Sequence, residues 1–369
     1  MEPTLILPPF GYGCWQLGSK GAEDYWGLKF TDELADTLVP AAIQAGITYM
    51  DTAEGYNNGD SERQLSRSLA KLSPEEREKV IIGTKILPNN AGDVKNTING
   101  MLERLQVTSL DLIMIHWPIT KEGMAHFAGN HKTEDGGHDY SNSDMDAVGE
   151  IPSTQTCFRD LMELQMSGKI KHIGVSNFGV NQLKEALATG CKIAVNQICY
   201  NLIFRACEYD VLPFCLANNI QVLCYSVLMQ GILTGRYATL EEIPEYRRRT
   251  RHFTSNKATN PKSRHGEDGH EEILLNTLVG LNEIAKEAGI PMSDMAQAWP
   301  LSNTGVSTCI VGGTKLEHIQ GVKRASGLML SEEVLKKIDA MTLELKNAMG
   351  SNMDLWQGMV EGKQTGRCN

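Results

Sequence analysis

The sequence predicts an α/β protein in which eight parallel strands close into a barrel, with long loops after strands four and seven. Three observations predict it. Short apolar segments rich in Ile and Val alternate with longer helical patterns, eight such segments occur, and no G-x-G-x-x-G motif follows an early one. Strands covered on both faces read as continuous apolar runs, and repeated strand–helix units imply a parallel sheet. The lack of the glycine motif disfavours an open dinucleotide-binding sheet.

The predicted strands are residues 10–15, 47–50, 80–85, 110–115, 170–175, 193–198, 220–225 and 308–311. Helical patterns cover residues 31–45, 61–72, 92–105, 156–167, 180–188, 208–218 and 316–325. Ser61 and the run Ser73-Pro74-Glu75-Glu76 are typical of helix starts, and Gly46, Gly190 and Gly289 stand where helices should end. Eight such units are typical of a (β/α)8, or TIM, barrel.

Two segments interrupt this rhythm, and both follow strands. Residues 120–153 are rich in Gly, His, Asp and Asn, and residues 239–269 carry Arg247-Arg248-Arg249-Thr250-Arg251. Loops after strands lie on the face where barrel enzymes build their sites. The arginine run is either a solvated surface or a loop that folds over a bound pyrophosphate. We expect residues 1–369 to form a single barrel domain whose tail, residues 349–369, either covers the mouth or frays.

Composition narrows the class of protein. The net charge is −10, from 35 basic and 45 acidic side chains, which gives no electrostatic reason to expect nucleic acid or an anionic membrane as partner. The nine cysteines form no C-x-x-C pair, as expected for reduced, buried thiols. Residues 1–13 do not resemble a signal peptide, and no run of about 18 apolar residues is present. We therefore expect a cytoplasmic protein.

Four ionisable side chains end or closely follow the second, third and fourth predicted strands. They are Asp51, Tyr56, Lys85 and His116. A charged group is costly inside a barrel but stable at its rim, and adjacent strands bring such groups together.

This set suits the reduction of a carbonyl, where hydride addition places negative charge on the substrate oxygen. A phenol can protonate that oxygen, but an unperturbed tyrosine has a pKa near ~10. We expect the Lys85 ammonium to lower the pKa of Tyr56 toward the working pH, and Asp51 to hold the lysine. A histidine within hydrogen-bond distance would orient the carbonyl and stabilise the oxyanion.

Seven segments at the predicted strand ends occur in a characteristic order. They are Asp51-Thr52-Ala53-Glu54-Gly55-Tyr56 with Ser61-Glu62, Gly83-Thr84-Lys85, His116-Trp117-Pro118, residues 168–178, residues 195–202, Leu223-Cys224-Tyr225-Ser226 and Gly312-Gly313-Thr314-Lys315. In this order they resemble the aldo-keto reductase superfamily, from about residue 10 to residue 330. The resemblance implies that Asp51, Tyr56, Lys85 and His116 form the catalytic tetrad.

The resemblance also implies a nicotinamide cofactor, NADPH with NADH as the alternative. Ser176, Asn177 and Gln197 would hold its carboxamide, Tyr225 would stack on its ring, and residues 312–318 would meet its 2′-phosphate at a helix start. The full implied set is Cys14, Trp15, Ser176, Asn177, Gln197, Tyr225, Ser226, Gly312, Thr314, Lys315 and His318. The substrate pocket would be walled by Trp15 and Trp117, with Trp26 as a further candidate.

The chain departs from the family pattern at several of these positions. Val311 stands where proline is common, Val227 interrupts a Tyr-Ser-Pro-Leu run, and Gly321-Val322 replaces an acidic residue and asparagine. The choice between NADPH and NADH therefore stays open. The expected partner is a small carbonyl substrate, and the sequence does not indicate an oligomeric state.

Two other function classes stay open at this point. Residues 200–205 resemble a form shared with potassium-channel β subunits, which have the same fold and act mainly on a partner. An isomerase or aldolase barrel would instead use Lys85 as a Schiff base. No metal is expected, because the spacing of His126, His131 and His138 matches no ligand pattern.

Overall fold

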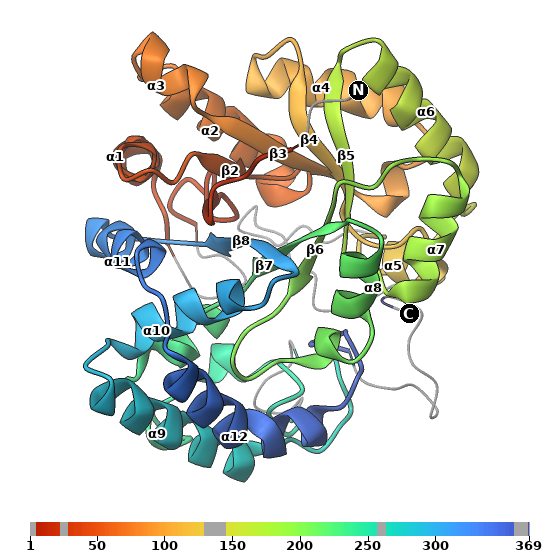
Figure 1. Ribbon diagram of the computed structural model, residues 1–369. Coiled ribbons are helices and arrows are strands. Elements are labelled where there is room, and N and C mark those ends of the chain that lie inside the picture. Colours follow the sequence, from red (N-terminus) through yellow and green to blue (C-terminus); the bar gives the residue numbers. More distant parts are fainter. Residues whose placement is uncertain (1–4, 23–28, 129–144, 257–262, 358–367, 369) are drawn as a thin grey trace.

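The computed structural model describes residues 5–22, 29–128, 145–256, 263–357 and 368 (Figure 1). Its parallel strands form a closed barrel in sequence order, and β8 pairs with β1 to complete it. The strands are β1 (Phe10–Gly13), β2 (Tyr49–Asp51), β3 (Ile81–Ile86), β4 (Leu110–Ile115), β5 (Ile170–Ser176), β6 (Val195–Cys199), β7 (Gln221–Tyr225) and β8 (Val306–Val311). The predicted barrel is confirmed, and each strand lies where the apolar segments predicted it.

Helices surround this barrel (Figure 1). They are α1 (Asp32–Gln44), α2 (Asp60–Leu69), α3 (Pro74–Glu78), α4 (Val94–Leu105), α5 (Lys121–Ala125), α6 (Thr154–Met166), α7 (Val180–Ala188), α8 (Val211–Ala217), α9 (Glu271–Glu287), α10 (Met292–Ala298), α11 (Leu316–Ser326) and α12 (Glu332–Met349). No helix in the described part of the chain is long and apolar enough to cross a membrane.

Helices α9, α10 and α12 are absent from the sequence prediction, and so is the short α5, which lies in the segment 120–153 predicted as a loop. Helix α12 buries only a narrow stripe, Ile338, Thr342, Leu345 and Met349, and packs against α9. A stripe this narrow leaves most of the helix polar, so the apolar periodicity is weak. The pairing of α9 with α12 is a tertiary contact that neither segment reveals alone.

The predicted turn signals mostly hold. Gly46, Gly190 and Gly289 take positive φ angles of 92°, 84° and 67° directly after helices, as glycines that end helices do. Ser73 forms a capping box with Glu76 before α3. Ser61, however, is not a helix start: it lies inside α2, and its buried hydroxyl donates to the Cys14 carbonyl at 2.7 Å.

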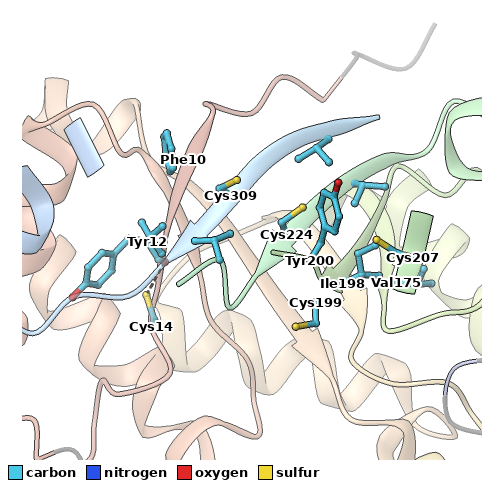
Figure 2. Close-up of a cluster of buried hydrophobic side chains, with 14 of the residues drawn as sticks. Phe10, Tyr12, Cys14, Val175, Ile198, Cys199, Tyr200, Cys207, Cys224 and Cys309 are labelled. Carbon is cyan, nitrogen blue, oxygen red and sulfur yellow. Dashed lines mark hydrogen bonds between the residues drawn. The ribbon is translucent and has the colours of Figure 1, made fainter. Parts of the chain in front are cut away.

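The barrel interior is apolar below its rim. Side chains alternate between the lumen and the helices along each strand, and the buried lumen cluster comprises Leu5, Tyr49, Leu112, Met114, Val195, Leu223 and Ile310. The larger core lies between the strands and the helices, and Figure 2 shows part of it. There Cys224 on β7 and Cys309 on β8 lie opposite each other in the strand register. All nine cysteines are buried thiols.

Candidate active site

A cavity of about 610 Å³ opens at the C-terminal ends of the strands. Residues from the rims of β1, β2, β4, β5, β6, β7 and β8 line it. Among the predicted site residues the lining includes Trp15, Asp51, Tyr56, His116, Trp117, Ser176, Asn177, Gln197, Tyr225, Ser226, Gly312, Thr314 and His318. The convergence predicted from the strand ends is thus present in the structure.

The floor of this cavity holds a buried lysine with three acceptors. The Lys85 ammonium donates to Asp51 Oδ2 at 2.7 Å, to the Thr52 carbonyl at 2.8 Å and to Tyr56 Oη at 3.1 Å. Lys85 is fully buried and Asp51 nearly so. An ammonium has three N–H donors, and each of the three has an acceptor here. One of these acceptors is the phenol oxygen of Tyr56.

These contacts set the protonation states of the floor. Burial lowers the pKa of Lys85, but Asp51 and Tyr56 outweigh it, so the pKa is raised and the amine stays cationic. Burial raises the pKa of Tyr56 above its ordinary value, against the lowering effect of Lys85. We expected the lysine to bring that pKa down; its contribution has the expected sign, but burial is larger. Tyr56 is therefore a protonated acid at neutral pH.

His116 faces the same space as Tyr56. Their ring centroids lie 5.5 Å apart at 72°, and Trp15 packs edge-on to Tyr56 at 4.9 Å. Burial, with a smaller contribution from Lys85, holds the pKa of His116 well below its usual range. A neutral imidazole carries one N–H donor, so phenol and imidazole can both approach a single carbonyl oxygen.

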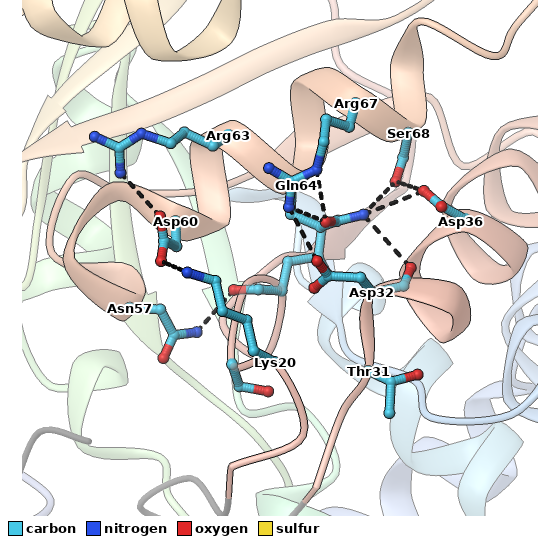
Figure 3. Close-up of polar contacts among 12 residues, drawn as sticks. Lys20, Thr31, Asp32, Asp36, Asn57, Asp60, Arg63, Gln64, Arg67 and Ser68 are labelled. Carbon is cyan, nitrogen blue, oxygen red and sulfur yellow. Dashed lines mark hydrogen bonds and ion pairs between the residues drawn. The ribbon is translucent and has the colours of Figure 1, made fainter. Parts of the chain in front are cut away.

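The turn that carries Tyr56 is fixed by polar contacts with the first strand's loop (Figure 3). Asn57, in left-handed conformation with φ of 47°, donates to the carbonyls of Trp15 at 3.1 Å and Leu17 at 2.7 Å. Asp60 at the start of α2 pairs with Lys20 at 2.6 Å. Asparagine tolerates this backbone conformation better than most residues, which explains its place after the tyrosine.

The implied carboxamide ligands form one connected group at the ends of β5, β6 and β7. Asn177 donates to the His116 carbonyl at 3.0 Å and accepts the Tyr225 hydroxyl at 2.7 Å. The Ser176 hydroxyl donates to the Gln197 carbonyl at 3.0 Å, and the Gln197 amide donates to Asp51 Oδ1 at 2.7 Å. The group therefore reaches the tetrad through Gln197. Asn177 has φ of 62° and Ser226 has φ of 55°, conformations that are costly and concentrate at functional sites.

The opposite end of the cavity is lined by basic side chains and glycine backbone. Its cations are Arg236, Arg247 and Arg324, beside Gly312, Gly313, Thr314 and His318. Two polar side chains from β1 and its loop hold the glycine backbone: the Tyr12 hydroxyl donates to the Gly313 carbonyl at 3.0 Å, and the Gln16 amide donates to it at 3.3 Å. Sequence reasoning missed Gln16, Arg236 and Arg324.

Two predicted cofactor residues do not line the cavity. The Cys14 thiol is fully buried behind the rim, because Gly13 and Trp15 on either side of it face the cavity and alternate residues of an extended strand face opposite ways. Lys315 is exposed at the residue before α11 and lies outside the lining. Of the arginine run, only Arg247 lines the cavity. Arg249 and Arg251 are buried, so the run is not the solvated surface that was one of its two alternatives.

The C-terminal segment covers part of the mouth. Arg251 is buried and donates to the carbonyls of Met349, Asn352 and Asp354, at 3.1–3.3 Å. Beyond this anchor Trp356 lines the cavity, with its ring 6.2 Å from that of Tyr225 and within 7° of parallel. The described part of the tail is therefore packed into the site.

Several sequence expectations fall elsewhere. Trp26, His131 and His138 lie outside the described residues. His126 lines the cavity and contacts Arg264 at 2.5 Å. Within the described ranges no group of three or more His, Cys, Asp or Glu side chains is placed to hold a metal ion.

Residues 9–342 match the Aldo/keto reductase family. The chain belongs to this family. The aldo-keto reductase chain is 28% identical to the methylglyoxal reductase YeaE of Escherichia coli over 339 residues, which cover 91% of each chain. It is 30% identical over 357 residues, 91% of this chain and 90% of the other, to a Schizosaccharomyces pombe protein whose name groups it with voltage-gated potassium channel β subunits.

Among solved structures, an aldo/keto reductase from Klebsiella pneumoniae in complex with NADP and acetate is similar, with a TM-score of 0.63 and 23% identity over 96% of both chains. This likeness supports the fold. With the family match and the oxidoreductase relative, it follows that the chain is an NAD(P)H-dependent oxidoreductase of the aldo-keto reductase type.

Proposed function

We propose that this aldo-keto reductase reduces an aldehyde or ketone to an alcohol, reversibly, with hydride from NADPH and a proton from Tyr56. The observation that carries the proposal is the 3.1 Å contact in which Lys85, already paired with Asp51, donates to the Tyr56 oxygen. Because the lysine donates, the phenol's own proton is left for the substrate oxygen. Once that proton is transferred, the ammonium stabilises the phenolate.

The residues fit a nicotinamide dinucleotide. The cavity runs from His116 at the catalytic end to His318 at the basic end. Four lining side chains each have a buried polar atom without a partner among the described residues: His116 Nδ1, Gln230 Oε1, Gln297 Oε1 and Trp356 Nε1. Buried polar atoms of this kind call for a polar ligand. The bound cofactor supplies the hydride.

Each part of such a cofactor has protein groups suited to it. Ser176, Asn177 and Gln197 would bind the carboxamide, and Tyr225 would support the ring. Arg236 and Arg247 would neutralise the pyrophosphate. The start of α11, which Thr314 and Lys315 precede, would take a 2′-phosphate together with Arg324, which favours NADPH over NADH. Neutral His116 would donate to the carbonyl and to the developing oxyanion.

The substrate end of the cavity is aromatic. Trp15, Trp117, Phe127 and Tyr56 line it together with His116. These walls favour a small apolar or aromatic carbonyl, and methylglyoxal is a sensible first probe because a relative is named for its reduction. We further propose that residues 1–369 act as one catalytic domain in a reducing compartment such as the cytoplasm, on the support of nine buried cysteines that form no disulfide.

A second candidate is a regulatory subunit that binds NADPH with little turnover. The Schizosaccharomyces pombe relative favours it. The Schiff-base alternative is disfavoured, because an amine nucleophile must be neutral whereas the pKa of Lys85 is raised by Asp51 and Tyr56 despite its burial.

A spectrophotometric screen of NADPH and NADH oxidation across aldehydes, ketones and quinones separates the candidates. Turnover with the wild-type protein and none with Tyr56→Phe, at equal cofactor affinity, is the expected result. Tyr200→Phe is the matched control, since it removes a buried phenol hydroxyl that donates to Glu208 and belongs to a residue outside the cavity lining. Tight NADPH binding without turnover on any carbonyl would favour the regulatory subunit.

A further inference from the structure

Tyr49 places a phenol in the lumen two residues before Asp51 on β2. Its side chain is fully buried, in a cluster whose other members are hydrocarbon or thioether side chains, among them Leu112, Met114 and Val195. A phenylalanine would fill this space with the same ring. The hydroxyl group therefore needs its own explanation, because burying a hydroxyl without a partner is costly.

The neighbouring strands leave room for this phenol. A Cβ atom at Gly11 on β1 would lie 2.4 Å from Tyr49 Cδ1. A Cβ atom at Gly83 on β3 would lie 2.3 Å from the Tyr49 hydroxyl oxygen itself. Any side chain at either position would displace the tyrosine. The two glycines thus admit the ring on one side and the hydroxyl on the other.

The hydroxyl donates to the catalytic carboxylate. Tyr49 Oη lies 3.1 Å from Asp51 Oδ1, which also accepts the Gln197 amide at 2.7 Å. The other oxygen, Oδ2, accepts Lys85 at 2.7 Å. Asp51 therefore carries two neutral donors on one oxygen and an ammonium on the other. Burial and the charge of Asp51 raise the pKa of Tyr49, so it remains a neutral donor throughout the working range.

We propose that Tyr49 is a positioning residue that draws charge from Asp51 and so determines, through Lys85, how strongly Tyr56 holds its proton. This inference rests on the proposed function. Asp51 competes with the phenol for the ammonium, and its negative charge opposes ionisation of Tyr56. A donor on Oδ1 weakens both effects. Without the hydroxyl, Lys85 is drawn toward Asp51 and the phenolate loses support.

The other titratable groups in this environment are few. Cys14 from the loop after β1 and His116 from the end of β4 act on the same cluster. Burial raises the pKa of the Cys14 thiol, and burial lowers the pKa of His116, so both are neutral. The charged groups that face the Tyr56 phenol are therefore Asp51 and Lys85. Tyr49 donates its hydrogen bond to Asp51.

The test is the pH dependence of alcohol oxidation, whose rising limb reports ionisation of Tyr56. Tyr49→Phe should move that limb upward by roughly half a pH unit. It should also lower kcat/KM about twofold in both directions at neutral pH, since the overall equilibrium links the two directions. Incorporation of 3-fluorotyrosine at position 49, a more acidic phenol and hence a stronger donor, should move the limb downward. Tyr200→Phe should leave it in place.

The outcomes distinguish a failure of this inference from a failure of the proposed function. NADPH dissociation constants and melting temperatures identify a variant that has lost its fold, and the fluorinated protein then still provides a test. Opposite shifts for the two changes at position 49 support the inference. A limb that stays in place in both, or moves the same way in both, overturns it. A wild-type protein without turnover would instead refute the proposed function.

Discussion

Replacing Lys85 by methionine removes the cation from the floor of the site while keeping an unbranched chain. In the structure its nitrogen lies 3.1 Å from Tyr56 Oη. At an effective dielectric constant of about 20, two unit charges at that separation interact by roughly 5 kcal/mol. That energy corresponds to roughly four units in the pKa of Tyr56. If about half of it is expressed in the transition state, carbonyl reduction should slow about a hundredfold.

The same substitution also breaks a buried ion pair, which costs about 3–5 kcal/mol of folding free energy when one partner remains. Lys85→Met should therefore lower the urea midpoint, and adding Asp51→Asn should restore most of the stability without restoring activity. NADPH oxidation at saturating carbonyl measures the chemistry, and cofactor fluorescence measures binding. A folded Lys85→Met protein that binds NADPH normally and works within tenfold of wild type would refute the electrostatic role assigned to this lysine.

Three further changes have definite expected results. Lys315→Ala should weaken NADPH binding about fivefold and NADH binding not at all, whereas Arg247→Ala should weaken both; equal losses in the Lys315 variant would contradict a 2′-phosphate site there. Arg251→Met should release the C-terminal segment, raise the substrate KM several-fold and shift Trp356 fluorescence to the red, and an unchanged emission would count against the anchor. Burial lowers the pKa of His252 to about 4, below its unfolded value. The stability that neutral His252 contributes is therefore complete above about pH 6.5 and is lost as the pH falls toward 4. His252→Asn should flatten this pH dependence of the urea midpoint, and an unchanged dependence would assign it to other groups.

The strands, and the clustering of the four proposed tetrad residues, could be predicted because their signals are local. A buried parallel strand is an apolar run, and a charged residue directly after it can lie only at the rim. His116 directly follows β4, Lys85 is the last residue but one of β3, and the structure places both in one site. The rule gives no information about which side of a strand end a residue faces, and Cys14, which the family resemblance implied, lies outside the cavity lining.

The anchors of the site could not be predicted, because they depend on contacts between distant segments. Arg251 is one of several arginines in its loop, and nothing local marks it as the one that holds the carbonyls of residues 349–354. Trp356 lies in a tail with little other apolar character. Only the closed barrel, which brings the loop after β7 and the C-terminal segment to one mouth, places these residues at the cavity.

The apolar lumen beneath the tetrad explains why the Asp51 carboxylate needs directed hydrogen-bond donors. The side chains of Leu112, Met114 and Val195 have no hydrogen-bond donor for the carboxylate. Its stabilisation must therefore come from a few directed donors. Lys85 donates only to Oδ2 of Asp51. The hydrogen bonds to Oδ1 come from Tyr49 and Gln197. Gln197 is also one of the residues that would hold the nicotinamide carboxamide. The Asp51 carboxylate is therefore linked both to the barrel core, through Tyr49, and to the implied nicotinamide site, through Gln197. Tyr56 is therefore connected, through Lys85 and Asp51, to groups on either side of the carboxylate.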